Sequence, residues 1–152
     1  MIKLMTEIVR IKNIKNYTQE IINGELILTP KEIYITEQEL NKTILTHSII
    51  LECIIKKDNN IISNKTKYRA ILDDIWKTMP TQKILQTTTF NMKLGNENGV
   101  DGYKWCSNLH MSIQSKDAKN SMKEIINMIN VNNYSIKMSI KLETGNIINF
   151  MK

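Results

Sequence analysis

The sequence predicts an α+β fold: a two-layer sandwich in which two amphipathic helices cover one face of a mainly antiparallel sheet. Residues 103–114 and 135–142 alternate between apolar and polar side chains, which is the period of a half-buried strand. Apolar residues within 68–79 and 118–129 recur at the spacing of one helix face. The apolar face of a sheet has to be buried against another element, so the helices are expected to cover it.

The first third of the chain predicts short strands. Residues 7–12 are rich in β-branched side chains, which favours a strand, and Asn23-Gly24 indicates a turn. Residues 25–29 and 32–36 are two further candidate strands. They are separated by Pro30, which is expected at a turn or an edge because proline lacks the N–H that a central strand needs.

Two features follow before the first long helix. Thr36 and Glu39 have capping-box spacing, which predicts the start of a brief helix. Residues 44–57 are apolar and β-branched with no polar face, which is typical of a central strand covered on both sides. A buried helix over 48–57 is the alternative, and residues 61–62 are expected to return as a hairpin.

The first predicted helix carries an apolar stripe from Tyr68 to Met79 and ends at Pro80. Residues 81–85 add one more turn. The second begins at Ser115 or Asp117 and ends within 130–133. Its stripe consists of Ala118, Met122, Ile125, Ile126 and Ile129.

Four strands are predicted around the second helix. Residues 90–94 form a strand, the glycine-containing residues 96–102 form a hairpin loop, and residues 103–114 form the returning strand. Residues 135–142 and 147–150 form the last hairpin. We therefore expect one domain over 1–152, with a β-rich part at 1–63 and a helix-hairpin-helix-hairpin part at 64–152.

Composition sets the class of protein. The 152 residues include 27 Ile, 19 Lys and 18 Asn but only two Ala, which favours a very AT-rich genome such as that of an intracellular bacterium, a protist parasite or a giant DNA virus. Residues 1–7 reach an acidic side chain before an apolar core forms, so we expect no secretion signal and an intracellular protein. No apolar run approaches the length of a membrane span, so no membrane partner is expected.

The net charge of +6 is unevenly distributed. Residues 1–60 carry eight basic and eight acidic side chains, so residues 61–152 hold the whole excess. A basic excess favours anionic partners such as nucleic acid.

The soft metal ligands are too few and too dispersed to predict a metal site. His47, Cys53, Cys106 and His110 are the only histidines and cysteines. On one extended strand, Cys106 and His110 would lie roughly 13 Å apart, which is too far for one zinc ion. We expect reduced, buried cysteines and no cofactor.

The polar side of the predicted sheet is the candidate binding face. It carries lysines and no acid, and it could contact phosphates, another protein or a second copy of the chain. An open sheet face in water is the alternative. The residues expected to bind are Lys93, Lys104, His110, Lys137 and Lys141. The sequence thus predicts a non-catalytic binding or assembly module, acting through this face or through strand edges, with a protein partner or itself ahead of nucleic acid.

A catalytic alternative rests on Asp101, Gln114 and Lys116. The pattern of an Asp, then Gln, any residue and Lys resembles the site of restriction-type nucleases, and the order helix, strand, strand, helix, strand partly resembles their core. That resemblance implies a Mg²⁺-dependent nuclease that activates water. The family core has three strands before its second helix, which would require a turn at Ser107-Asn108.

Overall fold

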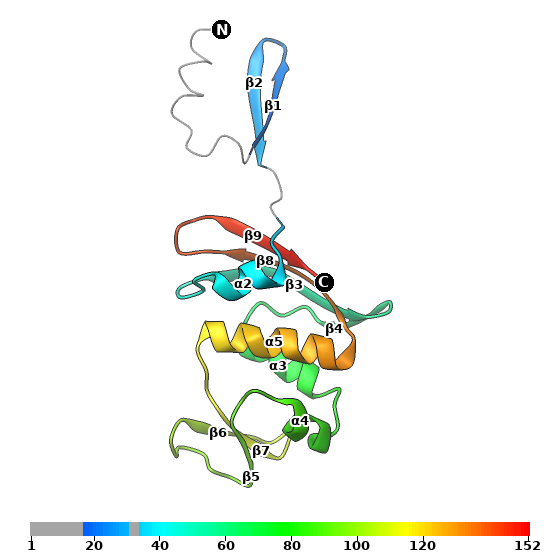
Figure 1. The fold of residues 1–152 in the computed structure, drawn as a ribbon, viewed down its shortest axis with the longest axis vertical. Coiled ribbons are helices and arrows are strands. Elements are labelled where there is room, and N and C mark those ends of the chain that lie inside the picture. Colours follow the sequence, from blue (N-terminus) through cyan, green and yellow to red (C-terminus); the bar gives the residue numbers. More distant parts are fainter. Residues whose placement is uncertain (1–16, 31–33) are drawn as a thin grey trace. The chain divides into compact units, whose positions relative to one another are not determined.

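The computed structural model describes residues 17–30 and 34–152 (Figure 1). These residues form four helices and three antiparallel sheets, so the predicted α+β class is confirmed. The chain divides into two compact units, Met1–Tyr34 and Ile35–Lys152.

The first unit contains a β-hairpin of β1 (Tyr17–Ile22) and β2 (Glu25–Pro30). Its turn is the predicted Asn23-Gly24, with φ of 52° and 78°. Two-residue hairpin turns of this kind need positive φ at both positions, which Asn and Gly tolerate best. The strand predicted over 7–12 lies outside the described residues, and the one predicted over 32–36 lies partly outside them.

A four-stranded sheet organises the second unit. It contains β3 (Ile49–Lys57), β4 (Asn60–Ser63), β8 (Ser135–Lys141) and β9 (Ile147–Met151), in the order β4-β3-β8-β9. The predicted hairpins at both ends of this sheet are confirmed. One face, here the inner face, is buried, and its members are Ile50, Cys53, Ile55, Ile136, Met138, Ile140 and Phe150.

The prediction that β3 is covered on both sides is wrong, as is its alternative of a buried helix. Ile50 and Ile55 are buried, but Ile49 and Leu51 are 58% and 46% exposed. The strand is central in hydrogen bonding, since it pairs with both β4 and β8. Apolar residues on both faces of a strand therefore do not require two covering layers, and within residues 35–152 one face of β3 is exposed.

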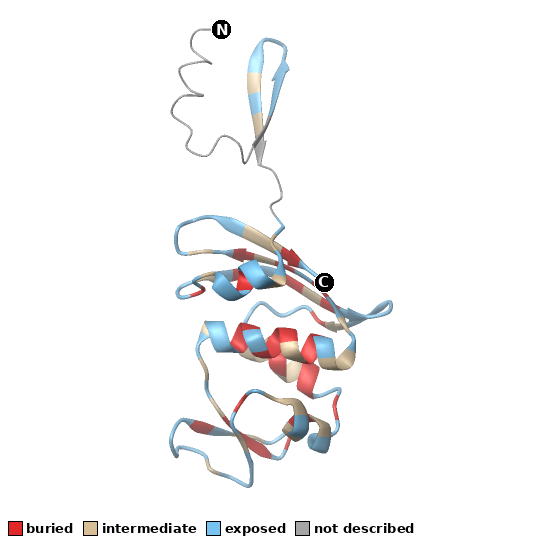
Figure 2. Cartoon of the chain, in the orientation of Figure 1, coloured by how far each residue is buried: buried red, intermediate tan, exposed pale blue. Residues whose placement is uncertain are grey.

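The helices lie on the inner side of this sheet. They are α2 (Glu37–Lys42), α3 (Tyr68–Trp76), α4 (Thr81–Thr87) and α5 (Ala118–Asn132). The capping box predicted at Thr36 and Glu39 is confirmed, with both reciprocal hydrogen bonds at 3.1 Å. α3 packs against α5 (Figure 1), and their apolar side chains share one core with the inner face. Figure 2 shows buried residues on both helices and on the strands of this sheet.

The remaining strands form a separate three-stranded sheet, so the prediction of one main sheet is wrong. Its strands are β5 (Met92–Leu94), β6 (Tyr103–Cys106) and β7 (Met111–Gln114), in the order β5-β7-β6. Figure 1 shows α3 and α5 between this sheet and the four-stranded one.

The predicted continuous strand over 103–114 is interrupted by a turn at residues 107–110. Cys106 pairs with Met111, so β6 and β7 form a hairpin. His110 adopts a left-handed φ of 52° in that turn. Residues 96–102 are not a hairpin loop, because β5 and β6 both pair with β7 and not with each other.

One charged side chain of α5 is fully buried. The Glu124 carboxylate accepts hydrogen bonds from the Thr89 N–H at 3.0 Å, the Thr89 hydroxyl at 2.9 Å, the Asn127 amide at 3.1 Å and the Thr88 hydroxyl. A buried carboxylate is costly unless it is fully hydrogen-bonded, and four donors meet that need. The contact ties α5 to the segment between α4 and β5.

Replacing Glu124 with alanine should lower the free energy of unfolding by about 2–4 kcal/mol, because four donors, two of them on the half-buried Thr88 and Asn127, lose their acceptor. Denaturant unfolding monitored by far-UV circular dichroism measures the change. Glu143→Ala is the matched control: Glu143 is exposed, and among the described residues its carboxylate pairs only with the His47 imidazole, at 3.2 Å, so a loss within about 0.5 kcal/mol is expected. Equal losses for the two variants would contradict a structural role for Glu124.

Candidate functional site

The exposed face of the four-stranded sheet, here the outer face, has an ordered pattern. Strand register places Lys141 between Ile49 and Ile147 in one row across the sheet. It places Lys137 between Ile54 and Met151 in a second row. Each lysine on the central strand β8 is therefore flanked by apolar side chains of β3 and β9.

The outer face is considerably apolar. Ile49, Ile147 and Met151 are 58%, 47% and 61% exposed, and Leu51 and Ile61 on the same sheet are 46% and 59% exposed. Scattered apolar residues are normal on a surface, whereas a contiguous group marks a contact region. The candidate binding face is thus more apolar than β8 alone indicates.

The prediction of an acid-free face is wrong. Glu52 lies on it, opposite Ser139, and it is exposed. The lysines are Lys56, Lys137 and Lys141, so three positive charges face one negative charge. The prediction failed because the strands beside β8 are β3 and β9, which the alternation within β8 cannot identify.

The edges of this sheet are poorly suited to adding a further strand. β4 is four residues long, and short edge strands are one way in which proteins avoid edge pairing. At the other edge, the carbonyl of Asn149 in β9 accepts the N–H of Ile35 at 2.9 Å. The face, rather than an edge, is the better candidate for a contact.

The five residues predicted to bind do not share one face. Lys137 and Lys141 lie in the four-stranded sheet, whereas Lys93 and Lys104 lie in the three-stranded sheet. His110 lies in the turn after β6, with its ring 6.3 Å from that of Trp105. The Lys93 ammonium lies 4.7 Å from the Tyr103 ring centroid, a cation–π contact.

Asp101, Gln114 and Lys116 do lie close together in the structure. The side-chain amide of Gln114 makes the contacts that join them. That amide donates to the Asp101 carbonyl at 2.8 Å and accepts from Asn91 at 2.6 Å and Lys116 at 3.4 Å. The Asp101 contact uses the backbone and not the carboxylate. Gln114 therefore joins β7 to the loop before β6.

The contacts of Gln114 leave few free ligands for Mg²⁺. Magnesium prefers carboxylates and other oxygens in octahedral geometry. The Gln114 oxygen already accepts two hydrogen bonds. Within residues 17–30 and 34–152, no three acidic, histidine or cysteine side chains cluster as metal ligands would. The turn at residues 107–110 does supply a third strand before α5, but β8 pairs in the other sheet.

The two cysteines differ in their surroundings. Cys53 is 1% exposed on the inner face, and burial, followed by the Glu52 carboxylate, raises the pKa of its thiol to about 12. Cys106 is half-buried at the end of β6. The sequence expectation that Cys106 and His110 are separated along one strand is wrong, because a turn joins them.

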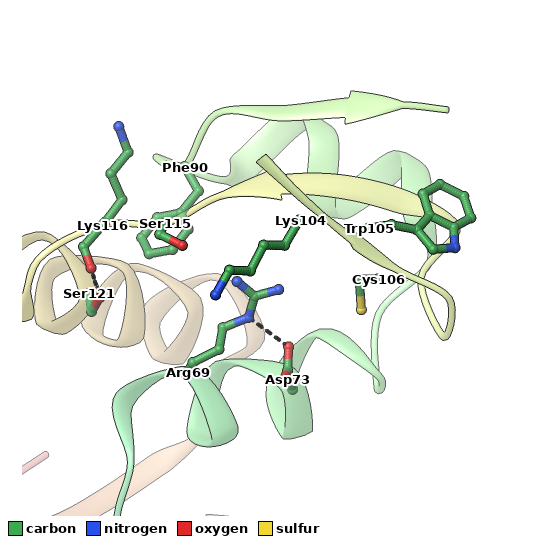
Figure 3. Close-up of a pocket in the computed structure, with 9 residues that line it drawn as sticks. All are labelled: Arg69, Asp73, Phe90, Lys104, Trp105, Cys106, Ser115, Lys116 and Ser121. Carbon is green, nitrogen blue, oxygen red and sulfur yellow. Dashed lines mark hydrogen bonds and ion pairs between the residues drawn. The ribbon is translucent and has the colours of Figure 1, made fainter. Parts of the chain in front are cut away.

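A pocket of about 400 Å³ lies between α3, β6 and the start of α5 (Figure 3). Its lining includes Arg69, Lys104, Lys116 and Ser115, with Asp73 as the one acid. Sequence reasoning assigned Lys104 to a sheet face and Lys116 to a catalytic site, and it missed Arg69. The only signal for Arg69 is its i, i+4 spacing from Asp73, which is common on helix surfaces.

No family model, curated protein or solved structure matches this chain. The part of the chain that the structure describes contains no helix that is both long and apolar enough to cross a bilayer. The case for a function therefore rests on the outer face and the pocket.

The two thiols should react at very different rates. At pH 9, a thiol of pKa about 12 is thiolate in only about a thousandth of molecules, so Cys53 should be inert in the folded protein. Titration with a disulfide reagent should detect one thiol in the native state and two in denaturant. The Cys106→Ser variant should leave none reactive before unfolding.

The same shift predicts how stability depends on pH. The folded pKa of Cys53 lies above its ordinary value of 9.0, so the unfolded thiol ionises first as the pH rises. This contribution to stability is present below pH 9 and declines between pH 9 and 12. Two equally reactive native thiols would contradict both expectations.

Proposed function

We propose that this protein is a non-catalytic assembly module that associates with a second copy of itself through the outer face. The observation that carries the proposal is the pair of rows in which Lys137 and Lys141 each lie between two apolar side chains. Lysine stems are apolar, so they add to the apolar area while their ammonium groups stay in water. Burying such a face against another is favourable in proportion to the apolar area removed from water.

The charges on the outer face determine how self-association depends on salt concentration. Each outer face carries three lysines and one glutamate, so two copies repel at long range. Salt screens that repulsion within a Debye length of roughly 8–10 Å near physiological ionic strength. Self-association should therefore strengthen as salt is added. Nucleic-acid binding through the same lysines should weaken as salt is added, because it depends on counterion release.

Light scattering over a range of protein and salt concentrations should show a mass that rises with both. Combining Leu51→Ser with Met151→Ser should weaken association by about tenfold or more, because it removes apolar area from the contact without changing its charge. Leu94→Ser is the matched control: Leu94 is 64% exposed on the three-stranded sheet, away from the outer face.

Three results would overturn this proposal. One is a monomer at every protein and salt concentration. Another is equal association of the outer-face double variant and the Leu94→Ser control. The third is binding to a labelled oligonucleotide that weakens with salt and is lost on combining Lys137→Glu with Lys141→Glu, which would assign the face to nucleic acid.

The Mg²⁺-dependent nuclease stays a prediction from the sequence. Its support is the proximity of Gln114 to Lys116 and to the Asp101 carbonyl. It requires Mg²⁺-dependent cleavage of nucleic acid that is lost on Asp101→Ala, and intact substrate after incubation with the unaltered protein would contradict it.

A further inference from the structure

We propose that the pocket between α3, β6 and the start of α5 binds a phosphate monoester, such as the terminal phosphate of a nucleotide, through Arg69 and Lys104. This site is separate from the outer face and adds a ligand to the proposed assembly role. Three cations and one acid line the pocket, so its interior carries a positive potential.

Arg69 is already held in place for an anion. Its Nε donates to the Asp73 carboxylate at 3.0 Å, and its guanidinium lies 5.3 Å from the ring centroid of the buried Trp76. Both contacts fix the orientation of the planar fork. The Asp73 contact uses only Nε, so the terminal NH₂ groups remain to donate in parallel to two phosphate oxygens, the geometry that distinguishes arginine from lysine.

Lys104 approaches the same point from the opposite wall. In Figure 3, its ammonium extends toward the Arg69 guanidinium. Within residues 17–30 and 34–152, the Lys104 ammonium has neither an ion pair nor a hydrogen bond. Two cations that point toward each other repel, and an anion between them removes that repulsion and gains two charge-assisted contacts.

The other lining residues define what else the ligand meets. The hydroxyl of Ser115 lies on the same side of the pocket, where it can donate to a phosphate oxygen (Figure 3). The Lys116 ammonium extends away from the Arg69–Lys104 pair and donates to the Gln114 amide oxygen at 3.4 Å. It therefore adds to the positive potential of the pocket without contacting the ligand. The Trp105 ring also points away (Figure 3), and Phe90, the other aromatic residue of the lining, is only 6% exposed, so the pocket offers little aromatic surface on which a base could stack.

These features predict the selectivity. With so little stacking surface, the site should bind the phosphate and ignore the base, so AMP, GMP and CMP should bind alike. The volume of about 400 Å³ leaves room for the rest of a nucleotide beside its phosphate. A doubly charged monoester should bind more tightly than the singly charged diester of a nucleic-acid backbone.

Calorimetric titration at constant ionic strength tests the site with inorganic phosphate, AMP, GMP and a 5′-phosphorylated oligonucleotide. Comparing AMP with the oligonucleotide distinguishes a free nucleotide from a chain end. Because Cys106 lines the pocket, bound AMP should also slow its reaction with a thiol reagent. An unphosphorylated oligonucleotide is the negative probe.

Lys104→Met should weaken AMP binding about tenfold or more, because it removes one of the two charge-assisted contacts. The matched control is Lys93→Met: Lys93 is an exposed lysine of the same sheet that does not line the pocket, and it should leave the affinity within about twofold. Arg69→Gln should abolish binding. Since Arg69 also packs on Trp76, the Lys104 variant keeps the test decisive if Arg69→Gln unfolds the protein.

The proposal is overturned if no probe saturates at millimolar concentrations, or if Lys104→Met and Lys93→Met bind AMP equally. It is also overturned if AMP binds but GMP does not, because a base would then be recognised. The outcome is independent of self-association: the variant carrying Leu51→Ser and Met151→Ser should bind AMP normally, and Lys104→Met should associate normally.

Discussion

The buried carboxylate of Glu124 is the contact on which the arrangement of the second unit depends. It holds Thr89 against α5 through two hydrogen bonds and thereby fixes the neighbouring Phe90. The Phe90 ring meets the Trp76 ring edge-on at a centroid distance of 5.6 Å. Trp76 in turn lies beneath the Arg69 guanidinium. A series of direct contacts therefore leads from the buried Glu124 carboxylate to Arg69 in the wall of the pocket. The packing of the core thus helps to position the pocket residues.

The helix α5 is buried around most of its circumference, because it packs against other elements on more than one side. A surface helix needs one apolar stripe, and Ile125 and Ile129 of α5 belong to the core that also includes the inner face of the four-stranded sheet. Figure 1 shows the three-stranded sheet on the other side of α5. The contact of Glu124 with Thr88 and Thr89 adds a polar attachment to the segment that leads into that sheet. A polar contact of this kind fixes one register between helix and loop, whereas apolar packing alone tolerates sliding.

The sequence predicts the local secondary structure, but it does not predict which strands pair with each other. The capping box at Thr36 and the alternation over residues 135–142 are local signals, and both elements form as predicted. The turn at residues 107–110 was missed because Trp105, Leu109 and Met111 keep an even spacing through it. Partner strands and pocket walls come from distant segments: β8 pairs with β3, and Lys104 meets Arg69 across the pocket. Spacing within one segment carries no information about such partners.

The lysines show most clearly why composition alone cannot assign a role. Lys137 lies between Ile54 and Met151, so its stem extends an apolar surface while its charge opposes a second copy. Lys104 lies in a concave pocket opposite an arginine that Asp73 and Trp76 hold in place. The first environment favours burial against an apolar face and the second favours a small anion. The net charge of the chain describes neither, because the neighbours of each ammonium group decide what it can bind.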